Sequence, residues 1–461
     1  MRNNAISEEA SRIFSSIMLK PEAIWGEVIQ ININELIRAD TLFCYLEDNN
    51  IELLTKYHHS DNNYHYVHYE ASDMSAHAIV SIFDNNIHID IQTNIGKYHF
   101  FSITKQEVAI IRYESDILAE PEYNKNFIED TIHREDSAIR QSIASNSTPT
   151  IRVLFLYTSS ALSMMSYPQT TGIKNEVYRY INEGNESFLN SEINAHLELA
   201  YLGPTDYDES SYSWDQVLNH FHSQGDGYID EVHMLRNKYA ADICVLMTNK
   251  DNYCGVARDI NVTANGAFCM IWPNYVYCGW RYSAIHEIGH LIGCRHNRSI
   301  DGTNTPYTYG HGYINCLEGN AWSTIMSYES SCETSNNHRI LHWSNPYVYY
   351  GSSSTGSVMY ENNARVWNER AEAVSNFRLD EANVTLTTNN NNDSALFESY
   401  YAKESIITLS GYNTYTGQVV DMRATKQIRI ASGTHIQGGV KISSIYSYCT
   451  GRTPIPSIYS R

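Results

Sequence analysis

Three histidines and a glutamate in one short segment could hold and use a metal ion. His286 and His290 are four residues apart, so on a helix both imidazoles would project from the same face. Gly293 lies where a helix can end in a left-handed residue, and the following turn can return His296 as a third nitrogen ligand. Three histidines leave a fourth position for water, which is the pattern of catalytic rather than structural zinc. Glu287 adjoins the first ligand and can accept a proton from that water.

A bare HExxH sequence also occurs by chance in ordinary surface helices. The glycine and the third histidine at fixed offsets make a chance match far rarer. We therefore expect one catalytic Zn2+ ion on His286, His290 and His296. A structural Ca2+ ion is left open, without support from the sequence.

The segment around these histidines, HEIGHLIGCRH, resembles the HExxHxxGxxH signature of the metzincin zinc proteases. Metzincins also carry a methionine turn beneath the metal, and residues 323–328 resemble one, with Met326 as its methionine. Four further stretches are similar to bacterial reprolysin-like enzymes, which include the peptidyl-Asp metalloendopeptidases; these stretches are residues 241–246, 253–257, 309–313 and 342–346. The resemblance covers about residues 151–379, half of the chain, and implies a zinc-dependent peptide hydrolase.

The same resemblance implies roles for residues around the metal. Tyr328 matches a tyrosine that astacin- and serralysin-like metzincins place near the zinc or the developing oxyanion; the alternative is a purely structural tyrosine. Cys254 and Cys278 bracket the segment before the active helix, and the resemblance implies that they pair. One departure concerns the subgroup, because reprolysins proper carry Asp after the third histidine and this chain has Asn297.

A basic residue beyond the methionine turn bears on specificity. In the resembled peptidyl-Asp enzymes the residue after the cleaved bond is acidic, and the wall of its pocket follows the methionine turn, here residues 329–343. Arg339 is the fixed positive charge of that stretch, and its planar guanidinium suits a carboxylate. We therefore expect cleavage before Asp or Glu. The open alternative is a structural ion pair of Arg339 with Glu329 or Glu333.

Composition limits the kind of protein that positions these residues. The 461 residues exceed what one hydrophobic core usually holds, and 42% hydrophobic with 18% charged residues indicates a folding chain. No stretch reaches the roughly 18 apolar residues of a membrane helix. The net charge of −20 argues against nucleic-acid binding, because few cations are present to replace counterions. We expect protein or peptide substrates and a monomer.

The cysteines bear on the compartment. Of the nine, seven lie between Cys244 and Cys332, which indicates partial disulfide crosslinking in an oxidising environment. The first residues lack the apolar region of a signal peptide. We therefore expect a secreted or cell-surface protein, exported either with a leader not seen in this sequence or by another route.

Three parts follow from the patterns along the chain. Residues 1–149 contain alternating apolar and polar runs that predict an antiparallel meander, ending in an exposed linker at 129–150; this part weakly resembles the propeptide of such enzymes. Residues 150–379 alternate strand and helix, which predicts an α/β metzincin domain with a mixed, largely parallel sheet and an active-site helix. Residues 380–461 predict a small all-β module.

The function expected from the sequence is that of a secreted zinc metalloendopeptidase made as a proenzyme. Zinc would polarise the scissile carbonyl, Glu287 would act as the general base, and zinc with Tyr328 would hold the oxyanion. The alternative is a catalytically silent binding or adhesion protein that retains the zinc fold, against which the intact Glu287 counts. In a further interpretation the tail is the working part and the metzincin domain only processes it.

Overall fold

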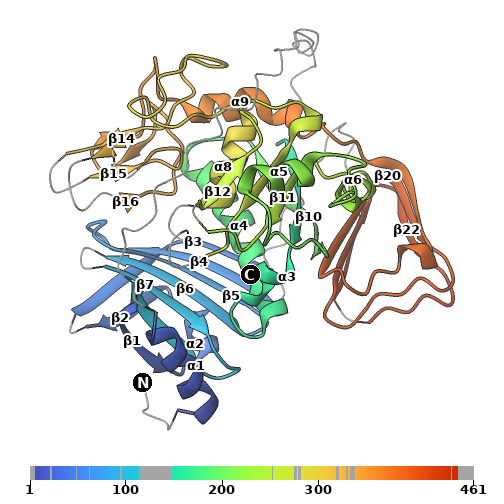
Figure 1. Ribbon diagram of the computed structural model, residues 1–461, viewed down its shortest axis with the longest axis horizontal. Helices are drawn as coiled ribbons and strands as arrows, with labels where there is room; N and C mark the ends of the chain where they lie inside the picture. The colour runs from blue at the N-terminus through green and yellow to red at the C-terminus, as the bar shows by residue number, and fades with distance from the viewer. Residues whose placement is uncertain are drawn as a thin grey trace.

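The computed structural model contains two large sheets with helices packed against them (Figure 1). It describes residues 6–20, 23–47, 49–61, 63–93, 96–113, 148–251, 253–274, 278, 282–317, 321–328, 331–332, 338–437 and 439–444. The linker expected at residues 129–150 lies outside this set up to residue 147. Within the described residues, none of the helices has both the length and the apolar composition that a bilayer crossing requires.

The first large sheet, called here the N-terminal sheet, is an antiparallel meander of eight strands in the order β1-β8-β7-β6-β5-β4-β3-β2. Alternating apolar residues on one face build a core of their own, which includes Leu53, Val67 and Ile89. The strands are β1 (Ala23–Ile29), β2 (Thr41–Leu46), β3 (Asn49–Asp61), β4 (Tyr64–Glu70), β5 (His77–Phe83), β6 (Asn86–Thr93), β7 (Gly96–Ser102) and β8 (Val108–Tyr113), with helices α1 (Glu8–Met18) and α2 (Ile33–Leu36) beside them.

The first strands of the second large sheet come from residues 150–379, where strands and helices alternate along the chain as predicted. Strands β10 (His196–Pro204), β9 (Thr150–Tyr157), β11 (Ile243–Met247) and β13 (Phe268–Ile271) are parallel, and β12 (Gly255–Ala257) is an antiparallel edge strand. Fully buried runs such as β9 are typical of parallel strands covered on both faces. The helices are α3 (Ser159–Ser163), α4 (Gln169–Asn190), α5 (Trp214–His222), α6 (Glu231–Lys238), α8 (Ser283–Ile292) and α9 (Asn363–Val374).

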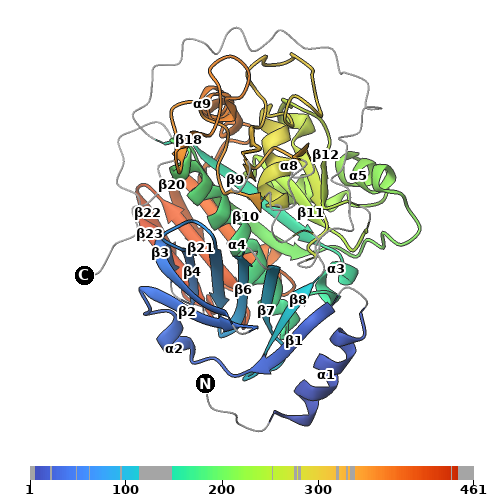
Figure 2. The same cartoon turned by 90° about the vertical axis from the view of Figure 1, so that its left-hand side faces the viewer.

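Helix α4 connects the two sheets. It packs against β10 on one side and against β4, β5 and β6 of the N-terminal sheet on the other (Figure 2). Residues at helical spacing, among them Ile173, Val177 and Ile181, join the apolar core shared with β9 and α8. The opposite side of the helix faces the N-terminal sheet with polar and charged residues, which are discussed below.

The irregular segment between α8 and α9 holds five short strands in two small sheets. These are β14 (Ile314–Asn315), β15 (Trp322–Ser323) and β16 (His338–Arg339), which form one sheet, and β17 (Tyr349–Tyr350) with β18 (Ser353–Ser354). The methionine turn follows β15 directly.

The C-terminal part is a stack of parallel strands. Asn383 pairs with Ser405 and Ser405 with Gln427, so the chain returns to the same line after 22 residues. Its elements are β19 (Glu381–Leu386), a 3-10 turn (Thr388–Asn390), β20 (Phe397–Thr408), β21 (Val419–Ala424), β22 (Gln427–Ile430) and β23 (Val440–Ser444).

This stack continues the second sheet instead of standing apart from it. Strand β20 pairs antiparallel with β10 through Tyr201 and Glu398, and both parts contribute to one hydrophobic core. The buried Arg152 of β9 donates to the carbonyl oxygens of Tyr239 and Ser399. The β10–β20 pairing and the Arg152–Ser399 hydrogen bond both join the tail to the second sheet. A domain boundary near residue 380, expected from the sequence, remains a prediction.

Candidate metal centre

Helix α8 carries the first two histidines on a fully buried segment. All of its residues from Ser283 to Ile292 are buried, mainly against β12, β13 and α4. It ends at Gly293, whose φ of +128° is in the region that favours glycine. The Gly293 N–H donates to the carbonyl oxygens of Gly289 and His290, so the helix closes there and the chain turns back. The turn predicted from the sequence therefore brings His296 to the helix.

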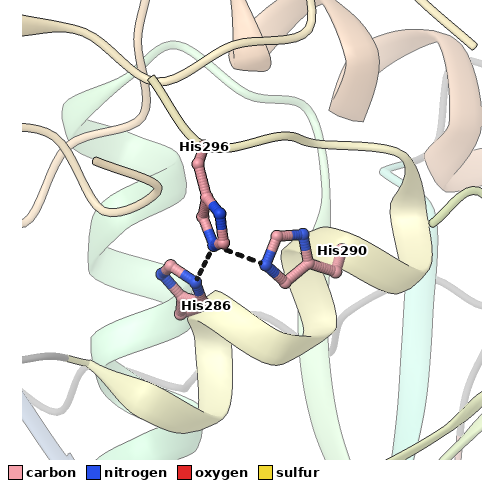
Figure 3. A group of neighbouring side chains, drawn as sticks. All are labelled: His286, His290 and His296. Atoms are coloured by element: carbon pink, nitrogen blue, oxygen red, sulfur yellow. Dashed lines mark hydrogen bonds between the residues drawn. The ribbon is translucent and has the colours of Figure 1, made fainter. Parts of the chain in front are cut away.

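The three histidines converge on one point (Figure 3). The Nε2 atom of His296 lies 3.2 Å from Nε2 of His286 and 3.0 Å from Nε2 of His290. The Nδ1 atoms face carbonyl oxygens, 2.8 Å from that of Ile325 for His286 and 2.9 Å from that of Cys294 for His290. A ring that donates from Nδ1 keeps the lone pair of a neutral imidazole on Nε2. The Nε2 lone pairs of His286 and His290 both point toward Nε2 of His296, an arrangement that suits a cation shared by the three rings.

The protonation of these rings fits a metal. Burial lowers the pKa of His290 to about 4, and burial together with the charges of His290 and His286 holds the pKa of His296 well below its usual range. The imidazoles of His290 and His296 therefore favour the neutral form, as metal ligation requires. Three imidazole nitrogens, with carbonyl oxygens beside the second ring nitrogen of His286 and of His290, match the donor set and outer shell of zinc sites.

The methionine turn lies directly beneath the helix. The carbonyl of Ile325 accepts from His286, and Met326 is fully buried. A Cβ atom at Gly289 would lie 2.8 Å from Sδ of Met326 and 2.7 Å from the ring of Trp343. The glycine inside HEIGH is therefore needed because the turn approaches the helix closely at this position.

The carboxylate of Glu287 is packed against the edge strand β12. Glu287 is 3% exposed, and a Cβ atom at Gly255 would lie 2.7 Å from its Oε1 atom. The charge of Glu287 adds to the effect of burial in raising the pKa of the Cys269 thiol on β13, which places the carboxylate beside that strand. The disulfide between Cys254 and Cys278 adjoins Gly255 and joins the edge strand to the segment before α8.

Tyr328 lies beside the third ligand. Its ring centroid is 4.5 Å from that of His296. The side chain of Asn297 fixes this arrangement, because its Oδ1 accepts from the Tyr328 N–H at 3.0 Å and its Nδ2 donates to the hydroxyls of Ser299 and Ser331. A buried amide both donates and accepts here, so Asn297 fits the position without burying a charge.

Arg339 of β16 is buried next to the methionine turn. Its Nη2 atom donates to the carbonyl oxygen of Ser327 at 2.5 Å, and its charge contributes to lowering the pKa of His296. The guanidinium therefore lies within electrostatic range of the third ligand. Its two alternative partners from the sequence, Glu329 and Glu333, lie outside the described residues.

Two further residues contribute to the site without having been predicted to do so. Gly255 leaves room for the Glu287 carboxylate, and His311 places Nδ1 2.8 Å from the carbonyl oxygen of His296. His311 is completely buried and supports the backbone of the third ligand. The sequence signal available was their occurrence in two of the stretches similar to reprolysin-like enzymes, 253–257 and 309–313.

The remaining cysteines give a second disulfide, between Cys316 and Cys332. Among the described residues, Cys44, Cys244, Cys269 and Cys294 are buried free thiols. Burial raises the pKa of each of these thiols, so none of them is a ready thiolate ligand at neutral pH.

Comparison with known proteins gives matches over the same region. Residues 147–340 match the family model Reprolysin_5, described as metallo-peptidase family M12. A peptidyl-Asp metalloendopeptidase of Stenotrophomonas maltophilia (strain K279a) is 37% identical over 239 residues, covering 51% of this chain and 54% of that protein. Its namesake from Xanthomonas campestris pv. campestris is 35% identical over 246 residues, covering 53% and 55%. The chain thus spans about half the length of the curated relatives it matches. The crystal structure of metalloproteinase-II from Bacteroides fragilis aligns with a TM-score of 0.34 at 12% identity, over 64% of this chain and 87% of that one.

Proposed function

We propose, from the membership of residues 147–340 in metallopeptidase family M12, that this chain is a zinc-dependent endopeptidase made as an exported proenzyme. The observation that carries the proposal is that Nε2 of His296 lies within 3.2 Å of the Nε2 atoms of both His286 and His290. The names of the curated relatives support the same class of activity.

In the proposed reaction each side chain of the site has a separate chemical role. A zinc ion on the three histidines supplies Lewis acidity to the scissile carbonyl and lowers the pKa of the attacking water. Glu287 accepts a proton as the water oxygen bonds to the carbonyl carbon, and it delivers that proton to the amine as the C–N bond breaks. The hydroxyl of Tyr328 donates to the developing oxyanion, and Asn297 holds the tyrosine beside His296 for this purpose.

Hydrolysis of casein by the purified protein tests the proposal. We expect activity that a zinc chelator abolishes and that added Zn2+ restores. A folded, zinc-loaded protein without turnover on casein or on a peptide library would instead favour the silent binding or adhesion protein considered from the sequence.

The N-terminal sheet is proposed as the prosegment of this proenzyme. The face of α4 beneath it is strongly polar, with buried Asn175, Glu176, Arg179, Glu183 and Glu186. Tyr66 of the sheet donates to Glu186 at 2.8 Å, and Asn175 donates to the backbone oxygens of Ser81 and Asn86. The polar part of this surface can be exposed to water again at low cost, which suits a cover that leaves. Tyr64, Ile79 and Phe83 of the sheet add apolar contacts to the core around α4.

The same sheet reaches the pocket wall beyond the methionine turn. The rings of His77 and His338 are 6.1 Å apart, Tyr350 donates to Glu70 at 3.2 Å, and Lys56 lies 5.8 Å from the Tyr350 ring. These contacts support an inhibitory role, because they fix β16 and its neighbours while the sheet is in place. Release of the sheet would free this wall for substrate.

Processing gives a direct prediction. We expect the mature enzyme to begin within residues 129–150, the linker predicted from the sequence, which ends at the start of β9. N-terminal sequencing of the active, secreted protein measures this. An active enzyme that still begins near Met1 would make the N-terminal sheet a permanent accessory domain.

Gly255→Ala is expected to lower kcat by about tenfold to a hundredfold with little loss of metal, because the new Cβ displaces the Glu287 carboxylate and not a ligand. Gly302→Ala is the matched control, since its Cβ would meet only the Arg298 carbonyl oxygen at 3.9 Å. The measurement is kcat and metal content for both variants. Equal kcat values in Gly255→Ala and Gly302→Ala would show that Gly255 is not needed to position the Glu287 carboxylate.

Export is proposed from the two disulfides, Cys254–Cys278 and Cys316–Cys332, which are stable in oxidising compartments. A preference for acidic residues after the cleaved bond is proposed from the position of Arg339 and is argued in the Discussion.

A further inference from the structure

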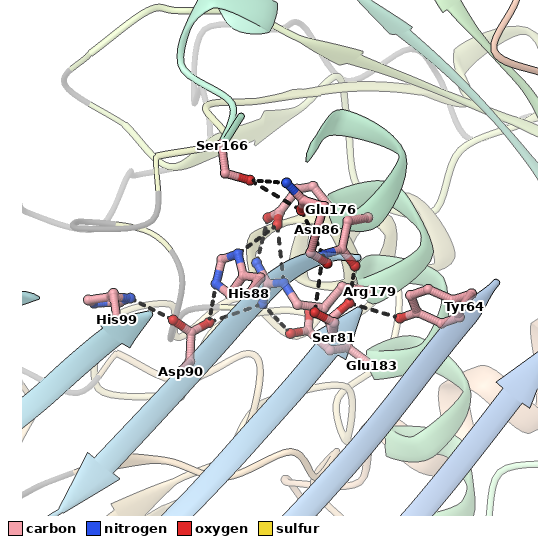
Figure 4. Close-up of polar contacts among 11 residues, drawn as sticks. Tyr64, Ser81, Asn86, His88, Asp90, His99, Ser166, Glu176, Arg179 and Glu183 are labelled. Atoms are coloured by element: carbon pink, nitrogen blue, oxygen red, sulfur yellow. Dashed lines mark hydrogen bonds and ion pairs between the residues drawn. The ribbon is translucent and has the colours of Figure 1, made fainter. Parts of the chain in front are cut away.

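A second group of potential metal ligands lies in the N-terminal sheet, far along the chain from α8 (Figure 4). It consists of His88 and Asp90 on β6 and His99 on β7. His88 and Asp90 are two residues apart, so both side chains project from the same face of the strand. Asp90 is the direct register partner of His99. The geometry of two neighbouring strands therefore brings the three side chains together.

The ligand atoms of this group are close and buried. Each residue is at most 2% exposed, and one ligand atom from each lies within 4.8 Å of the other two. The carboxylate of Asp90 lies between the rings, with Oδ2 3.0 Å from Nε2 of His88 and Oδ1 2.6 Å from Nδ1 of His99. Two imidazole nitrogens and a carboxylate oxygen form a donor set that zinc accepts.

Helix α4 covers the group with further charges (Figure 4). Oε2 of Glu176 lies 3.6 Å from the other ring nitrogen of His88, the arrangement in which an outer carboxylate orients a metal-bound histidine. Arg179 pairs with both Glu176 and Glu183, and its Nη1 lies 3.6 Å from Oδ2 of Asp90. All three α4 residues are buried.

The charges of this assembly do not balance on their own. Asp90, Glu176 and Glu183 bring three negative charges when ionised, and Arg179 brings one positive charge. The remaining two negative charges equal the charge of one divalent cation. Burial, with the Glu176 and Asp90 charges adding to it against Arg179, raises the pKa of Glu183 to about 8. Burial and the two neighbouring carboxylates thus oppose the ionisation of Glu183, and a bound cation would favour it.

We propose that His88, Asp90 and His99 bind a divalent transition-metal ion of the Zn2+ class, at a site separate from His286, His290 and His296. The ligands come from the N-terminal sheet alone. With neutral histidines and all three carboxylates ionised, the ion and Asp90 leave one positive charge on the sheet. This charge meets the one net negative charge of Glu176, Arg179 and Glu183 on α4. The ion therefore strengthens docking of the sheet on α4, and by linkage docking strengthens its binding.

Counting metal ions in the full chain tests this proposal. Glu287→Gln serves as the parent, so that the chain stays uncut if it processes itself. The parent is expected to hold two zinc ions per chain after dialysis against metal-free buffer. Adding His290→Ala should leave one ion, adding His99→Gln should leave one, and adding both should leave none. A catalytic ion alone would give one, none, one and none, so failure of this proposal and failure of the proposed function produce different counts.

Co2+ absorption and a second ligand variant, His88→Gln, distinguish loss of the metal site from misfolding of a single variant. Loaded with Co2+ in the His290→Ala background, the full chain should show visible ligand-field absorption, which His99→Gln and His88→Gln both abolish. His77→Gln is the matched control, because His77 is a buried histidine of the same sheet outside the group and should retain the absorption. Zn2+ should also raise the Tm of the His290→Ala protein and leave the Tm of its His99→Gln derivative unchanged.

The proposal is wrong if the His290→Ala protein, folded by its circular dichroism, holds no ion and shows no cobalt absorption. The cluster would then be a hydrogen-bonded charge network that carries protons in place of a metal. It is equally wrong if the ion persists in both His88→Gln and His99→Gln, because the ligands would then lie elsewhere.

Discussion

Glu287→Gln is expected to reduce kcat for peptide hydrolysis by about 10²- to 10⁴-fold while the metal content stays at that of the parent. Glutamine has nearly the same size as glutamate but cannot accept a proton from the attacking water. The proposed ligands are the separate side chains of His286, His290 and His296, which the change does not alter. Steady-state kinetics on a quenched peptide and metal analysis of the same preparation measure both halves of the prediction.

Glu369→Gln is the control for a general effect of removing a carboxylate, because Glu369 is exposed and pairs with Arg365 on the surface of α9. We expect parent activity in this variant. Retention of more than about a tenth of kcat in Glu287→Gln would exclude Glu287 as the general base and would leave the base to another side chain.

The residues of the metal centre could be predicted from the sequence because short-range geometry decides their positions. The four-residue spacing of His286 and His290 fixes their common face, and Gly293 fixes where the helix ends. The structure reproduces both features, with a φ of +128° at the glycine. The family expected from HEIGHLIGCRH is likewise confirmed by the match of residues 147–340.

Features that depend on distant pairing were beyond prediction. The closeness of Gly255 to Glu287 depends on how the edge strand β12 packs on α8. The alternation of His88 and Asp90 is visible in the sequence, but the pairing with His99 depends on the register of β6 with β7. The counter-charges on α4 come from a segment that the chain reaches only after β8, a long connection, β9 and α3.

The tail shows the same limit. Its short β runs were predictable from their composition, and β20 to β23 are parallel strands. A separate all-β module remains a prediction. The antiparallel pairing of β20 with β10 was not predictable, because it joins Glu398 to Tyr201 across nearly two hundred residues. Local patterns predict which strands exist, and long-range packing decides which sheet they enter.

The second large effect is expected on specificity. Arg339→Ala should lower the preference for Asp over Leu after the cleaved bond by about ten- to a hundredfold, measured as the ratio of kcat/KM for two matched peptides. The arginine is buried beside the methionine turn and within electrostatic range of His296. A substrate carboxylate bound there would form charge-assisted hydrogen bonds in a site with little water to screen them. The relatives named peptidyl-Asp metalloendopeptidases give the same expectation.

A structural role for Arg339 predicts a different result, and the ratio separates the two. Arg339 also holds the carbonyl oxygen of Ser327, so its loss can loosen the turn and reduce kcat/KM for both peptides together. Arg370→Ala is the matched control, because Arg370 is a buried arginine that donates to the Val262 carbonyl oxygen at 3.0 Å. A structural arginine changes both rates and leaves their ratio intact, whereas a specificity residue changes the ratio.

Arg339→Lys should restore part of the preference, since a single ammonium keeps the charge but loses the two-pronged geometry. An unchanged ratio in Arg339→Ala, with a preference for bulky apolar residues, would place the determinant of specificity elsewhere in the pocket wall.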